Sequence, residues 1–112
     1  MDIDSVIKEA HIIARDFGLK LRINDTTDNV VNIKIYFDSE LFIQVYANQA
    51  KDKLNMNLVF KNRRLYGCDS EGGKTHIHPI ENPESHVFIT ERLELRDFII
   101  TALHVLEERE LL

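Results

Sequence analysis

Apolar side chains recur at every second position in three consecutive segments of the chain, residues 31–37, 41–47 and 54–60. A period of two is typical of a β-strand that buries one face and exposes the other. Short polar loops at 38–40 and 48–52 join the three segments. Such loops are too short for a crossover connection, so neighbouring strands must run antiparallel.

The two ends of the chain have the period of a helix instead. The N-terminal stripe consists of Ile3, Val6, Ile7, Ala10, Ile13, Ala14 and Phe17, and the C-terminal one of Leu95, Phe98, Ile99, Ala102, Leu103 and Leu106. We expect Asp4 or Ser5 to cap the first helix and Gly18 to end it. Further short strands are expected at 19–23, 63–68 and 74–80, with a tight hairpin turn at Lys61-Asn62.

This order predicts a single α+β domain over residues 1–112, with an antiparallel sheet of four to six meander-connected strands and both helices packed on one face. The strand residues expected against the helices are Val31, Ile33, Ile35, Leu41, Ile43, Val45, Met56 and Leu58. The other face carries Tyr36, Phe42, Gln44, Tyr46, Asn55 and Asn57, a polar and aromatic set that suits a groove or a homodimer surface.

Composition indicates a soluble cytoplasmic protein. Apolar residues make up 44% of the chain and charged residues 29%, and no apolar run approaches the roughly 20 residues that span a bilayer. The acidic start, Met1-Asp2-Ile3-Asp4, is unlike a signal peptide, and the single cysteine, Cys68, excludes an internal disulfide. The net charge of -5 argues against a wide nucleic-acid surface, but residues 61–78 carry four basic residues against two acidic ones.

Three of the five histidines fall within residues 76–86, next to that basic segment. His76 and His78 are two apart, so a strand would place both on one face. The same rule places Arg64, Tyr66 and Cys68 together. One hypothesis is therefore an enzyme in which His76 and His78 act as general acid and base on one substrate. The substrate-binding residues would be Arg64, Tyr66, Lys74 and His86.

Two other classes of function stay open. In a metal-binding protein, His76 and His78 would share an ion with a third ligand from His86, Glu81, Asp69 or Glu71. In a non-enzymatic binding module, the aromatic sheet face would bind a partner chain or a second copy. The chain has no P-loop, Rossmann fingerprint, EF-hand or zinc ribbon, so we expect no cofactor.

The segment Leu65-Tyr66-Gly67-Cys68-Asp69-Ser70, followed by a Gly-Gly turn and by His76, His78 and His86, resembles part of the TumE-like toxins of prokaryotic toxin–antitoxin pairs. Gly67-Cys68 separates the tyrosine from the aspartate here, which departs from the Arg-Tyr-Asp-Asn type of segment in that family. The resemblance implies a small cytosolic prokaryotic protein that acts on RNA or translation and is neutralised by an antitoxin-like partner. With that implication, the enzyme that uses His76 and His78 would be a metal-independent ribonuclease.

Overall fold

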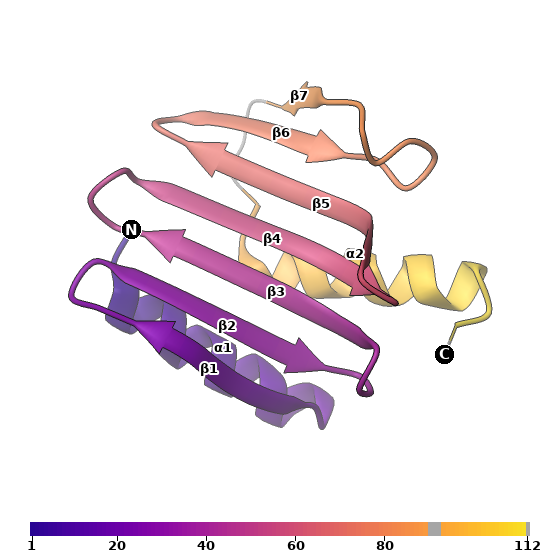
Figure 1. The fold of residues 1–112 in the computed structure, drawn as a ribbon, viewed down its shortest axis with the longest axis horizontal. Coiled ribbons are helices and arrows are strands. Elements are labelled where there is room, and N and C mark those ends of the chain that lie inside the picture. The colour runs from indigo at the N-terminus through magenta and orange to yellow at the C-terminus, as the bar shows by residue number, and fades with distance from the viewer. Residues whose placement is uncertain (90–92, 112) are drawn as a thin grey trace.

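The computed structural model of the chain describes residues 1–89 and 93–111. Within them it has two helices and seven strands (Figure 1). Their bounds are α1 Ile3–Phe17, β1 Lys20–Thr26, β2 Val30–Tyr36, β3 Leu41–Asn48, β4 Lys53–Phe60, β5 Arg63–Glu71, β6 Lys74–His78, β7 Val87–Ile89 and α2 Leu95–Glu108. No helix among the described residues is long and apolar enough to cross a bilayer.

All seven strands form one sheet in sequence order, and each neighbouring pair is antiparallel. The predicted α+β class is confirmed, although seven strands exceed the expected four to six. The additional strand is β7, which pairs with β6. Its three residues are too few to show a period of two, so the sequence pattern does not reveal it.

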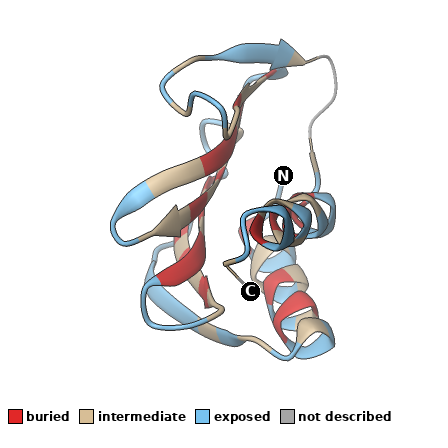
Figure 2. Ribbon diagram, turned by 90° about the vertical axis from the view of Figure 1, so that its right-hand side faces the viewer, coloured by how far each residue is buried: buried red, intermediate tan, exposed pale blue. Residues whose placement is uncertain are grey.

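Both helices lie on the same side of the sheet (Figure 2). The strand residues that were expected to face the helices are all buried, because alternation directs every second side chain to that layer. We call the opposite side the outer face. It carries the predicted polar and aromatic positions of β2 to β4.

The ends of α1 are set by local side-chain chemistry. Asp2, rather than the expected Asp4 or Ser5, is the N-cap, and its carboxylate accepts hydrogen bonds from the Asp4 N–H at 3.3 Å and the Ser5 hydroxyl at 3.0 Å. Gly18 ends the helix at a φ of 67°, which favours a residue without a Cβ.

Two tight turns fix the position of β5. Lys61 and Asn62, with φ of 50° and 65°, connect β4 to β5, and Gly72 and Gly73, with φ of 56° and 84°, connect β5 to β6. Positive φ at both central residues is typical of the hairpin turn whose twist matches the sheet. The tight turn predicted at Lys61-Asn62 is therefore confirmed.

Candidate functional site

The histidines of β6 gather on the outer face. In the register of the sheet, His76 lies opposite Asp69 of β5 and His78 opposite Gly67. His76 is partly exposed, whereas only 2% of His78 is accessible to solvent. The predicted extended segment and the shared face of the two imidazoles are both present.

Each ring nitrogen of His78 has a partner. Nδ1 lies 3.0 Å from the Pro83 carbonyl oxygen, and Nε2 lies 2.8 Å from Asp69 Oδ2. A carbonyl oxygen only accepts, so Nδ1 must carry a proton. The Nε2 contact with a carboxylate oxygen then needs a further proton between the two atoms, or a metal ion that binds both.

The loop after β6 brings the third histidine back to the first two. The Pro83 carbonyl accepts hydrogen bonds from His78 and from Arg64 Nη2, the latter at 3.1 Å, and so ties the loop to two strands. As a result, the His86 ring centroid lies 4.9 Å from that of His76 and 4.4 Å from that of His78. One nitrogen from each of the three rings lies within 4.8 Å of the other two. We call these three residues the histidine cluster.

Asp69 joins the histidine cluster from β5. Its Oδ2 atom lies 2.8 Å from His78 Nε2 and 3.6 Å from His76 Nε2. Its Oδ1 atom is buried and has no hydrogen-bond partner among the described residues. A buried carboxylate oxygen without a partner is unfavourable, so this carboxylate favours a cation or a proton donor at the cluster.

The predicted grouping of Arg64 with Tyr66 and Cys68 on one face is wrong. A β-bulge between Leu58 and Val59 of β4 pairs Arg64 with Val59 but Tyr66 with Leu58. One extra residue in β5 reverses the alternation. Arg64 therefore lies on the outer face with the histidines, while Tyr66 lies in the core.

Tyr66 packs under α2, away from the histidine cluster. Its ring stacks on Phe98 with a centroid distance of 5.4 Å and an angle of 22° between the ring planes. Burial, with a smaller contribution from Cys68, raises the pKa of the Tyr66 hydroxyl. Tyr66 is thus a core residue that the outer face does not present to a substrate.

Cys68 is a buried thiol on the same core side, which gives a first prediction. Burial, together with the charge of Asp69, raises its pKa from the ordinary 9.0 to about 11. Since the thiolate is the reactive form, an aromatic disulfide reagent at pH 8 should label native protein far more slowly than protein in urea.

The raised pKa of Cys68 favours the thiol in the folded state, so the free energy of unfolding should fall between about pH 9 and pH 11. The decline should be smaller in a Cys68→Ala variant, which keeps only the contribution of the Tyr66 hydroxyl. Rapid labelling of the native protein would contradict the burial of Cys68.

Lys74 lies at the edge of the site. It is exposed and pairs in register with Glu71. With His76, Asp69 and the largely exposed Phe88 it lines a hollow of about 320 Å³ beside the histidine cluster. Among the predicted site residues, the structure therefore places the three histidines together, Arg64 next to them through the Pro83 carbonyl, and Lys74 at the far end of the hollow that His76 lines, and it separates Tyr66 from them.

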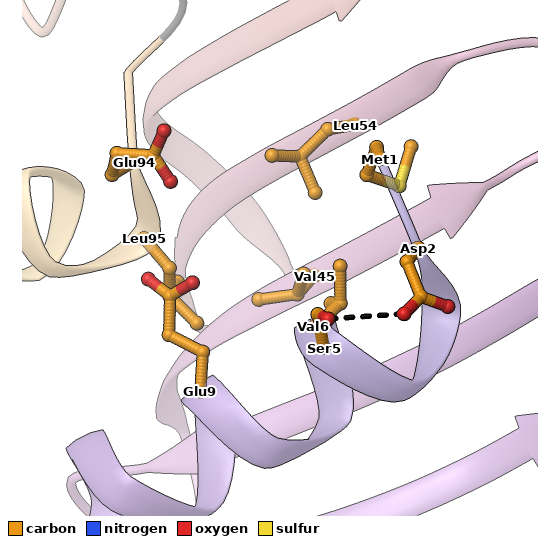
Figure 3. Close-up of a pocket in the computed structure, with 9 residues that line it drawn as sticks. All are labelled: Met1, Asp2, Ser5, Val6, Glu9, Val45, Leu54, Glu94 and Leu95. Atoms are coloured by element: carbon orange, nitrogen blue, oxygen red, sulfur yellow. Dashed lines mark hydrogen bonds between the residues drawn. The ribbon is translucent and has the colours of Figure 1, made fainter.

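A second hollow, of about 210 Å³, lies between α1 and the start of α2 (Figure 3). Glu9 and Glu94 both line it, above an apolar floor that includes Val45 and Leu54. Burial and the charge of Glu94 raise the pKa of Glu9, while backbone hydrogen bonds from Arg96 and Leu95 act in the opposite direction. Since Glu94 makes no side-chain cap, we interpret Glu9 as a capping group that ties α2 to α1.

The chain matches no protein-family model, and no curated protein or solved structure is significantly similar to it.

Proposed function

We propose that the chain is a histidine-ligated metal-binding protein that holds a divalent transition-metal ion, zinc in the first instance. The observation that carries the proposal is the convergence of His76, His78 and His86, with one nitrogen of each within 4.8 Å of the others. Imidazole nitrogen is a preferred ligand of zinc, copper, nickel and iron.

The spacing fits an ion after a small adjustment. Ligand bonds of about 2.0–2.1 Å in a tetrahedron place neighbouring nitrogens roughly 3.3 Å apart. The His86 ring is exposed and belongs to the loop after β6, so it is the ligand that can move inward most easily. His78, which is buried and hydrogen-bonded, would remain fixed.

The surroundings of His78 also resemble the support that metal-binding histidines need. The Pro83 carbonyl fixes the proton on Nδ1 and leaves Nε2 as the ligand atom. Asp69 Oδ2, 2.8 Å from Nε2, would lie beside an ion held by the three histidines and balance part of its charge, while the fourth ligand position would stay open to solvent.

A bound zinc ion would supply Lewis-acid chemistry to a ligand or water molecule at the exposed side of the cluster. The protein's part would be to hold the three imidazoles neutral and oriented, each with one free ring nitrogen for the ion. Because protonated imidazole cannot bind a metal, affinity should fall as the solution is acidified.

The test is a zinc titration of protein purified without a histidine tag. We expect one ion per chain by elemental analysis, and stabilisation against heat or urea that grows with zinc concentration. A cobalt-substituted sample should show the visible absorption of a site with mixed nitrogen and oxygen ligands. Substoichiometric metal, with no change in stability at any zinc concentration, would rule the proposal out.

A second candidate is the metal-independent ribonuclease, which the position of Asp69 favours. Its Oδ2 atom contacts both His76 and His78, an arrangement that can orient an imidazole for acid–base catalysis. His76 is the more accessible of the two. RNA cleavage that persists in EDTA and disappears in His76→Ala would support this function, and complete loss in EDTA would favour the metal.

A further inference from the structure

We propose that a hollow on the outer face, next to the histidine cluster, binds the phosphate group of a phosphate ester. The hollow has a volume of about 400 Å³ and spans β2 to β5. Its polar lining consists of two basic and three amide side chains, Lys34, Arg64, Gln44, Asn57 and Asn62. No carboxylate is among the described residues that line it, although the chain has a net charge of -5.

The Arg64 side chain is held in place before any ligand arrives. A Cβ added at Gly67 would lie 2.5 Å from Asn57 Oδ1 and 3.1 Å from Arg64 Cδ. The missing side chain of Gly67 therefore provides the space in which these two side chains lie. Arg64 Nη2 also donates a hydrogen bond to the Pro83 carbonyl at 3.1 Å, which holds the guanidinium group against the loop after β6.

Arg64 still has hydrogen-bonding capacity to spare. Its Nε atom is buried and has no partner among the described residues. A phosphate in the hollow cannot reach the buried Nε, so it would bind through the Nη hydrogens that the Pro83 carbonyl leaves free.

Lys34 supplies the second positive charge. Its Nζ lies 4.7 Å from the centroid of the Phe42 ring, so the ammonium group is kept over the hollow by a cation–π contact. Lys34 and Arg64 line the hollow from β2 and β5, and a flexible ammonium group together with a guanidinium group suits the several oxygens of a phosphate better than the two of a carboxylate. The amides of Gln44, Asn57 and Asn62 add neutral donors at the same surface.

Arg64 and His78 share the Pro83 carbonyl, so a phosphate on Arg64 would lie beside the histidine cluster. The inference nevertheless stands without the metal, because none of the residues that carry it is a proposed metal ligand.

The test is calorimetric titration of untagged protein in EDTA with inorganic phosphate, a nucleoside monophosphate and a short single-stranded oligoribonucleotide. We expect saturable phosphate binding, weakened at least about tenfold in Arg64→Gln and in Lys34→Gln. Lys8→Gln is the matched control, since Lys8 is exposed on α1 behind the sheet, and its affinity should change less than twofold. Tighter binding of the nucleoside monophosphate would identify a small-molecule phosphate ester as the ligand, and tighter binding of the oligoribonucleotide would identify RNA.

Lys34→Gln keeps the test decisive if Arg64→Gln fails to fold, because Lys34 has no part in anchoring Pro83. Absence of binding to all three probes at 20 mM would overturn the inference. An equal loss of phosphate affinity in Lys8→Gln and Lys34→Gln would also overturn it, because it would indicate a general effect of net charge. Zinc binding is measured separately, without EDTA, and does not require a bound phosphate. Either proposal can therefore fail while the other holds.

Discussion

Replacement of His86 by alanine is expected to weaken zinc binding by more than about a hundredfold, since the loss of a second-shell partner alone costs 10–100-fold. His86 is the exposed member of the histidine cluster, so the free energy of unfolding of the metal-free variant should stay within about 0.5 kcal/mol of the parent. Zinc at a hundred times its dissociation constant should stabilise the parent by about 2.7 kcal/mol. The variant should show almost none of that gain at the same concentration.

The matched control for this experiment is His11→Ala, which removes one exposed imidazole from α1. Its zinc affinity and zinc-dependent stabilisation should equal those of the parent. Urea titrations give the free energy of unfolding of each variant with and without zinc, for comparison with the parent. If His86→Ala retained full stabilisation by zinc, the ion would have to bind elsewhere, and the cluster would lose its proposed function.

The sheet was predictable because the alternation of apolar and polar residues follows directly from the geometry of a β-strand. A period of two in residues 31–37, 41–47 and 54–60 assigns both the strands and their buried faces, and the structure buries the expected side chains. Short loops then leave only an antiparallel meander. The sequence does not predict β7, because Val87–Ile89 is too short to show a period of two. Its largest side chain, Phe88, is also 72% exposed, so it does not mark a buried face.

Alternation along β5 does not predict which face of the sheet Tyr66 lies on. A β-bulge changes the pairing between two strands, and the sequence pattern of one strand does not show it. Counting by twos from Arg64 reaches Tyr66, but the pairing of β4 with β5 skips Leu65. A register depends on contacts between two strands, and one residue of slip exchanges the faces. The buried rings of Tyr66 and Phe98 are the packing that settles it.

The site was only partly predictable for a related reason. The spacing of His76 and His78 predicts a shared face, but the return of His86 depends on a non-periodic loop held by the Pro83 carbonyl. In the sequence, His86, Glu81, Asp69 and Glu71 are equivalent candidates for a third metal ligand. The register of β5 with β6 sets Asp69, and not Glu71, opposite His76.

Replacement of Phe98 by alanine should produce the largest loss of stability in the chain. Phe98 is fully buried in α2 and stacks on Tyr66 of β5. Truncation of a buried phenylalanine costs about 3–5 kcal/mol, out of a total of roughly 5–15 kcal/mol for a typical domain. We expect urea denaturation to give a midpoint far below that of the parent, because α2 would lose the contact of the Phe98 ring with Tyr66 of β5.

Ile100→Ala is the matched control, since Ile100 lies in the same helix but is 43% exposed. Its free energy of unfolding should change by about 0.5 kcal/mol at most. The Phe98 side chain lies on the core side of the sheet, so the fraction of Phe98→Ala that remains folded should bind zinc with the affinity of the parent. A Phe98→Ala variant as stable as Ile100→Ala would mean that α2 does not pack on the sheet through this residue. A loss of zinc affinity in the folded fraction would mean that the histidine cluster depends on the core beneath β5.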